Sequence, residues 1–200
     1  MSASHTPPPR AGRVPRDGSG LVLSAEPALP LATEDPVRRA ALSDLTRPQL
    51  RQLVAELAAE QERWRALVRH DRDRRVFECV LDEPAVEAWL ICWMPGHDTG
   101  FHDHDVSSGA VNVIEGEVCE DRLNAATPMT TAVYGAGQVF DFDSSDIHRV
   151  KHSGSAPAVT LHAYSPRLRR MGAYAVTRDG ALQRHPLAYG EELRPLEPAS

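Results

Sequence analysis

The 200-residue chain lacks several features that would assign it to particular classes of protein. It has only three cysteines, at spacings without a regular framework, which favours a reducing cytoplasm over a disulfide scaffold. No apolar run reaches the length of a transmembrane helix, and the start has no apolar signal region. The net charge of −6 and the lack of a basic stripe argue against nucleic acid as a partner. We therefore expect a cytoplasmic protein that binds neither nucleic acid nor a membrane, and we expect it to be a monomer.

Changes in composition along the chain predict a disordered start followed by one domain. Residues 1–30 are rich in Pro, Ser, Gly and Arg, which is typical of disordered segments. Residues 31–200 are long enough for a single domain with a sizeable core. In residues 40–70, apolar residues recur at helical spacing up to the end of the range, and Thr46 with Gln49 has the pattern of a capping box. From about residue 75 to 190, short apolar runs separated by turn residues predict strands.

Two histidines one residue apart, His102 and His104, carry the clearest chemical signal. Side chains at positions i and i+2 of a strand point to the same side, so both imidazoles can bind one metal ion. His148 is the candidate third ligand, because it ends an apolar run that predicts a second strand. Such pairs also occur by chance in a chain with nine histidines, but Gly96 before the pair and the strand-like AVNVI after it resemble the first motif of cupins, and this resemblance implies a metal site.

The expected metal site contains no carboxylate ligand, since no Glu follows His104 before Glu115. Three neutral imidazoles leave the metal electrophilic and leave three coordination positions open for a substrate and a second small molecule. Imidazole binds Fe, Mn, Ni, Cu and Zn, so these residues alone leave the identity of the metal open.

The stretch VTLHAY has the alternation of a strand with one polar and one apolar face. Thr160, His162 and Tyr164 fall on one face, and the apolar residues between them fall on the other. Buried polar groups need partners, so we expect a hydrogen-bonded Thr–His–Tyr chain that directs the phenol of Tyr164 toward the metal. A core network without a catalytic part is the alternative.

Two long segments resemble the cysteine dioxygenase family, which are thiol dioxygenases of the cupin superfamily. They are ICWMPGHDTGFHDHDVSSGAVNVIEGEV and IHRVKHSGSAPAVTLHAYSP, within residues 88–166. The resemblance implies a mainly β fold, a cupin (jelly-roll) β-barrel with a small helical N-terminal region. It also implies Fe(II) held by His102, His104 and His148, and the oxidation of L-cysteine by O2 to cysteine sulfinic acid. In this family a Ser/Thr-His-Tyr relay, here Thr160, His162 and Tyr164, lies beside the iron.

The chain departs from the family pattern at two places. Mammalian members cross-link a Cys to the Tyr, but the matching position here is Gly109, as is common in bacterial members, so we expect no thioether. The Arg that holds the substrate carboxylate falls between Arg75 and Cys79, depending on loop length. Arg75 is our candidate, although it belongs to a run of charges that by default is solvated. Other candidates for this role follow the YSP sequence: Arg167, Arg169 and Arg170.

Three functions remain open on the sequence. The favoured one is a cysteine dioxygenase, with a small thiol and O2 as its partners. The ambiguity about the Arg keeps open a dioxygenase of another small thiol, such as 3-mercaptopropionate. A non-catalytic or sensory cupin is the third, but such a module has no need of the polar chain expected in VTLHAY. The remaining reactive side chains, Cys79, Cys92 and Cys119, lie in or near expected strands, and we interpret them as small buried residues.

Overall fold

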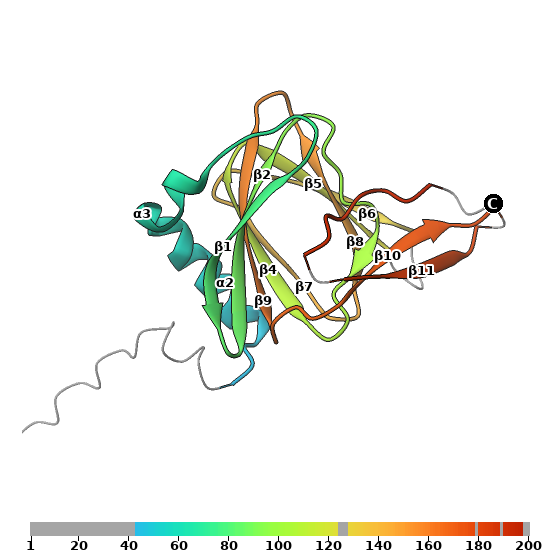
Figure 1. The fold of residues 1–200 in the computed structure, drawn as a ribbon, viewed down its shortest axis with the longest axis horizontal. Helices are drawn as coiled ribbons and strands as arrows, with labels where there is room; N and C mark the ends of the chain where they lie inside the picture. The colour runs from blue at the N-terminus through green and yellow to red at the C-terminus, as the bar shows by residue number, and fades with distance from the viewer. Residues whose placement is uncertain (1–42, 124–127, 179, 189, 198–200) are drawn as a thin grey trace, which may run out of the picture. The chain divides into compact units, whose positions relative to one another are not determined.

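The computed structural model of the chain describes residues 43–123, 128–178, 180–188 and 190–197 (Figure 1). The expected disorder of residues 1–30 lies outside these residues, as do residues 40–42 of the expected helical region, so both stay predictions. The described residues belong to one compact unit. None of its helices is long and apolar enough to span a membrane.

Two antiparallel sheets form the body of this unit. The five-stranded sheet contains, in spatial order, β1 (Val76–Glu83), β2 (Val86–Trp93), β9 (Ala158–Ser165), β4 (Ser108–Glu115) and β7 (Val139–Phe142). The six-stranded sheet contains β11 (Leu182–Leu187), β10 (Met171–Val176), β3 (His102–Asp103), β8 (Ile147–Ser153), β5 (Glu117–Leu123) and β6 (Thr130–Gly135).

A hydrophobic cluster fills the space between the sheets. Val111 and Phe142 contribute to it from the five-stranded sheet, and Val118 and Val150 contribute from the six-stranded sheet. The sheets therefore face each other as the two walls of a barrel (Figure 1). This confirms the expected fold, a mainly β, jelly-roll barrel of the cupin type with a small helical N-terminal region.

Helix α2 (Arg47–Ala59) covers the outer face of the five-stranded sheet. The backbone N–H of Thr46 donates to the side chain of Gln49 at 2.9 Å, as the capping-box pattern predicts. The buried residues of the helix are apolar and lie three or four positions apart, on one face: Leu50, Leu53, Val54 and Leu57. They pack in one cluster with Leu161 and Ala163 of β9, so the apolar face of that strand points outward, as expected.

The helical region ends earlier than the spacing of apolar residues predicts. Helix α2 ends at Ala59, and Glu60 leaves the helical conformation with φ −83° and ψ 63°. Two short turns follow, α3 (Gln61–Trp64) and η1 (Arg65–Leu67), so the helical stretch does not reach His70. The break turns Trp64 into the core, where its indole N–H donates to the carbonyl oxygen of Leu57 at 3.0 Å. Burial of this large ring outweighs continuation of the helix.

Two further expectations are corrected. His148 does not end a strand but is the second residue of β8, because β7 ends at Phe142 and the chain then passes through a turn from the five-stranded to the six-stranded sheet. In that turn the backbone N–H of Asp143 donates to the carboxylate of Asp146 at 2.9 Å. Cys92 and Cys119 are buried, but Cys79 is exposed, because it lies on the outermost strand of the five-stranded sheet.

Candidate metal centre

The three predicted histidine ligands lie together on the six-stranded sheet. His102 on β3 pairs directly with His148 on β8, and His104 is the first residue after β3. The ring centroid of His102 is 4.8 Å from that of His104 and 4.6 Å from that of His148. One nitrogen from each ring lies within 4.8 Å of the others. All three side chains are buried, so a metal ion here would be largely shielded from water.

The free ring nitrogens of this cluster fit a metal ion. Nδ1 of His102 lies 3.1 Å from the carbonyl oxygen of Gly100, and Nδ1 of His148 lies 2.7 Å from the carboxylate of Glu120. In contrast, Nε2 of His148 and Nδ1 of His104 are buried without a hydrogen-bond partner among the described residues. A buried polar atom without a partner is costly, and a metal ion would satisfy it.

Burial also sets the protonation of these histidines. Desolvation lowers the pKa of His102 to about 4 and lowers the pKa values of His104 and His148 well below their usual range. The imidazoles are therefore neutral near pH 7, which is the form that binds a metal ion.

The hydrogen-bonded chain expected on β9 is present. Thr160 Oγ1 lies 2.8 Å from Nε2 of His162, and Nδ1 of His162 lies 3.3 Å from the hydroxyl of Tyr164. The indole N–H of Trp93 donates to Thr160 Oγ1 at 2.8 Å, so the Thr hydroxyl proton is free to reach His162. Burial raises the pKa of Tyr164, so its phenol keeps a proton. Its ring centroid lies 5.2 Å from that of His104.

Arg75 lies in the same cavity as these groups. It is 6% exposed, whereas Arg72 and Arg74 are exposed, so Arg75 does not belong to a solvated charge run. Its guanidinium donates to the carbonyl oxygen of Asp98 at 2.6 Å and to that of Leu193. The guanidinium also lies 5.3 Å from the ring centroid of Trp93.

The other arginine candidates lie elsewhere. Arg167 pairs with Asp82 at 2.6 Å, Arg170 pairs with Asp105 at 3.2 Å, and Arg169 is exposed. None of the three lines the cavity that contains Arg75.

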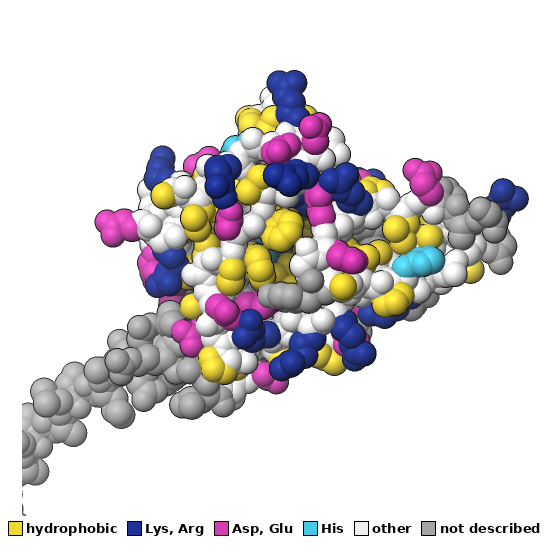
Figure 2. Space-filling model, viewed as in Figure 1, with side chains coloured by type: hydrophobic (Ala, Val, Ile, Leu, Met, Phe, Trp, Pro, Cys, Tyr) yellow, Lys and Arg dark blue, Asp and Glu magenta, His cyan; other side chains and the backbone are white. Residues whose placement is uncertain are grey.

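The cavity opens between the two sheets and has a volume of about 100 Å³. Its polar lining includes Arg75, His102, His148, His162 and Tyr164. Aromatic and aliphatic side chains form most of the remaining wall: Phe77, Trp89, Ile91, Trp93, Val150, Leu168 and Met171. Figure 2 shows hydrophobic side chains gathered in a hollow near the centre of this face, with charged side chains around it. Gly190 to Leu193 border the cavity as well, so a C-terminal segment narrows it to a small-molecule site.

Gly109 lies opposite Tyr164 on the neighbouring strand. A Cβ atom at position 109 would overlap the ring of Phe142. The Phe142 ring stacks on His104 with centroids 4.4 Å apart. An aromatic ring therefore occupies the space that a side chain at position 109 would need.

Sequence reasoning missed two acidic residues of this site. Glu120 on β5 contacts His148, and Glu192 contacts Arg75. Neither belongs to a recognisable motif. The one signal for Glu120 is a charged residue within a segment that otherwise reads as a strand, EVCEDRL.

Comparison with known proteins agrees with the geometry. The family model for cysteine dioxygenase type I matches residues 37–177. Cysteine dioxygenase type 1 of Danio rerio is 28% identical over 130 residues, which are 59% of this chain and 64% of that protein. The Homo sapiens protein of the same name is 31% identical over 86 residues, which are 38% of this chain and 43% of that protein. The matches thus span less than two thirds of the length of these curated relatives.

A solved structure of a Thermus thermophilus protein is similar with a TM-score of 0.46 and 21% identity, over 52% of this chain and 93% of that chain. The family model itself covers more than half of the present sequence. The chain therefore belongs to the cysteine dioxygenase type I family.

Proposed function

We propose that this protein is an iron-dependent thiol dioxygenase that converts L-cysteine and O2 to cysteine sulfinic acid. One observation carries the proposal: a single small cavity is lined by members of the histidine cluster, by His162 and Tyr164 of the polar chain, and by Arg75. The reaction inserts both atoms of O2 into the S–H group of the thiol, so it balances without a further reductant. We propose in addition that the protein acts as a cytoplasmic monomer, without nucleic acid or a membrane.

His102, His104 and His148 would hold the Fe(II). When bound, the ion would supply a Lewis acid and redox centre at which a thiolate and O2 react. The neutral imidazoles support this role, because each offers a nitrogen lone pair without a competing proton.

Arg75 would bind the carboxylate of the substrate. Two backbone carbonyl oxygens hold the guanidinium in place, and Glu192 lies 3.8 Å from Nη2. A guanidinium has five N–H donors in a fixed planar arrangement, which suits it to a substrate carboxylate. A fixed charge at one end of a small cavity orients the substrate so that its thiol points toward the histidines.

Tyr164 would hold a proton at its hydroxyl oxygen next to the reacting atoms. His162 and Thr160 fix the position of this hydroxyl through their hydrogen bonds. A pre-oriented O–H group can donate a hydrogen bond to an oxygen atom that gains charge during the reaction.

A second candidate substrate is 3-mercaptopropionate. It shares the thiol and the carboxylate of cysteine but lacks the amine, so the proposed contact with Arg75 would serve both molecules. The polar chain on β9 argues against the third candidate, a cupin that only binds a metal or ligand, because binding alone does not require a buried phenol held in this way.

Iron content combined with oxygen uptake tests the proposal. The purified protein should bind one Fe(II) and consume one O2 per thiol oxidised, with sulfinate as the product. L-cysteine, 3-mercaptopropionate and cysteamine should be compared at equal concentration. Preference for 3-mercaptopropionate would replace the first substrate with the second, and an iron-loaded protein without uptake on any thiol would exclude a dioxygenase.

A further inference from the structure

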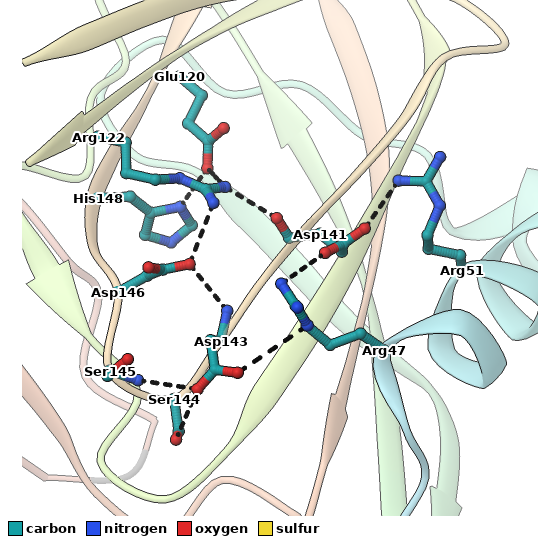
Figure 3. Close-up of polar contacts among 10 residues, drawn as sticks. All are labelled: Arg47, Arg51, Glu120, Arg122, Asp141, Asp143, Ser144, Ser145, Asp146 and His148. Carbon is teal, nitrogen blue, oxygen red and sulfur yellow. Dashed lines mark hydrogen bonds and ion pairs between the residues drawn. The ribbon is translucent and has the colours of Figure 1, made fainter. Parts of the chain in front are cut away.

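Glu120 is a buried carboxylate in contact with one proposed metal ligand. Its side chain is 4% exposed, and Oε1 accepts a hydrogen bond from Nδ1 of His148 at 2.7 Å (Figure 3). A carboxylate has only acceptors, so this contact keeps the proton of His148 on Nδ1. Nε2 is then left bare, and it is the nitrogen that has no partner among the described residues.

Arg122 holds Glu120 in this position. The two residues lie on the same face of β5, and Nη2 of Arg122 donates to Oε1 of Glu120 at 2.8 Å. The same guanidinium donates to Asp146 at 3.0 Å and to the carbonyl oxygen of Asp141 at 2.8 Å. Asp146 precedes His148 by two residues, so Arg122 connects the carboxylate to the turn that carries the ligand.

The contacts continue to the surface at helix α2. The carboxylate of Asp141 pairs with Arg47 at 3.2 Å and with Arg51 at 2.9 Å (Figure 3). Both helix arginines are more than 40% exposed, so their ion pairs should contribute little to stability. Removal of the buried charge of Glu120 or Arg122 should have a larger effect, because it leaves its partner unpaired.

His102 and His148 differ in what their Nδ1 atoms contact. Nδ1 of His102 lies near a backbone carbonyl oxygen, whereas Nδ1 of His148 lies against a carboxylate. A carboxylate hydrogen-bonded to an imidazole fixes its orientation and increases its strength as a metal donor.

We propose that Glu120 is a positioning residue that orients His148 for the metal and supplies negative charge, through one hydrogen bond, to a site without a carboxylate ligand. The inference rests on the proposed function only in taking His148 as a ligand. Arg122 serves the same purpose by holding Glu120.

Metal affinity of the full chain tests this role without relying on activity. Glu120→Gln retains an oxygen acceptor but loses the charge, and Glu120→Asp retains the charge but moves it away from His148. Affinity for Fe(II), measured by competition with a chelator, should fall about 10- to 100-fold in each variant. Arg51→Ala is the matched control, because it removes an exposed end of the same network and should leave affinity unchanged.

Two further readouts separate positioning from a structural role. Thermal unfolding of the metal-free proteins identifies a variant that fails to fold. If one substitution at position 120 prevents folding, the metal affinity of the other variant tests the role of Glu120. In Co(II)-loaded protein, the visible absorption bands should shift in Glu120→Gln but not in Arg51→Ala. Folded variants with wild-type affinity and unshifted bands would overturn the inference, even if thiols are oxidised. If affinity falls as expected while the wild-type protein oxidises no thiol, the proposed function fails and the inference stands.

Discussion

The carboxylate of Glu192 and the guanidinium of Arg75 form an ion pair at the cavity, with Oε1 of Glu192 3.8 Å from Nη2 of Arg75. Glu192 also accepts the backbone N–H of Arg75 at 2.8 Å, although 117 residues separate them along the chain. Glu192 of the C-terminal segment therefore contacts the same guanidinium that we propose to bind the substrate carboxylate.

We expect Glu192→Gln to lower KM for L-cysteine, because the substrate carboxylate no longer competes with a protein carboxylate for Arg75. The change should be up to about fivefold, as for a partly exposed ion pair worth ~0.2–1 kcal/mol. Steady-state oxygen uptake measures it, with cysteamine as a substrate that has no carboxylate and should be unaffected. Glu191→Gln is the control, since Glu191 borders the same cavity but accepts from the backbone of Ala188. An unchanged or raised KM would mean that Glu192 only anchors Arg75.

Replacement of Arg75 should affect carboxylate-bearing substrates selectively. Arg75→Ala should lower kcat/KM for L-cysteine by roughly 100-fold or more, because an unpaired carboxylate in the cavity costs a few kcal/mol. Cysteamine should be oxidised at nearly the wild-type rate. The exposed Arg169 provides the control variant Arg169→Ala. Equal losses for both substrates would indicate that Arg75 acts through its contacts with Asp98 and Leu193 and not through the substrate.

Each of the three clustered histidines should be required for metal binding. His102→Ala, His104→Ala and His148→Ala should each abolish stoichiometric iron, measured by metal analysis, together with oxygen uptake. His185→Ala should retain both, because His185 lies on β11 and does not line the cavity. Full iron occupancy in all three cluster variants would refute the assignment of the site.

Loss of the Tyr164 hydroxyl should separate metal binding from turnover. Tyr164→Phe keeps the buried ring, so iron content should match the wild-type protein. Turnover should slow by about 10- to 10000-fold if the phenol acts in proton transfer or in hydrogen-bond stabilisation. Parallel measurement of iron content and kcat checks both parts. Turnover at the wild-type rate would show that the Thr–His–Tyr chain is a core hydrogen-bond network without a catalytic part.

A side chain at position 109 should destabilise the protein. Gly109→Ala places a methyl group against the Phe142 ring, and such overpacking typically costs about 1–3 kcal/mol of unfolding free energy. Gly135→Ala is the control, because the nearest atom to its added Cβ lies 3.7 Å away. Denaturant unfolding of the metal-free proteins measures the difference, and equal stability of the two variants would contradict this packing of Phe142 against Gly109.

In the wild-type protein, intact mass should equal that of the unmodified sequence, since a thioether at Tyr164 would remove two hydrogens.

Short-range patterns determined much of the candidate site. The alternation in VTLHAY predicted which side chains of β9 face the cavity, and Thr160, His162 and Tyr164 are joined by hydrogen bonds there. The spacing of His102 and His104 likewise predicted neighbouring rings. The capping box predicted the start of α2. These features were readable because the geometry of one strand or one helix end depends on a few consecutive residues.

The sequence alone did not identify which distant segments meet. Strand pairing between β3 and β8 brings His148 to His102, and packing of the C-terminal segment brings Glu192 to Arg75. Burial, and not the charge run itself, distinguished Arg75 from its exposed neighbours.

Glu120 shows the physical reason most clearly. Period-two alternation placed its side chain on a face of β5, but the partner of that face depends on which strand lies alongside it. Which strand lies alongside β5 depends on the burial of whole sheet faces, and the free energy of that burial is summed over many residues far apart in the sequence. Local pattern therefore determined the chemistry that each element carries, and tertiary packing decided which chemistry is brought together.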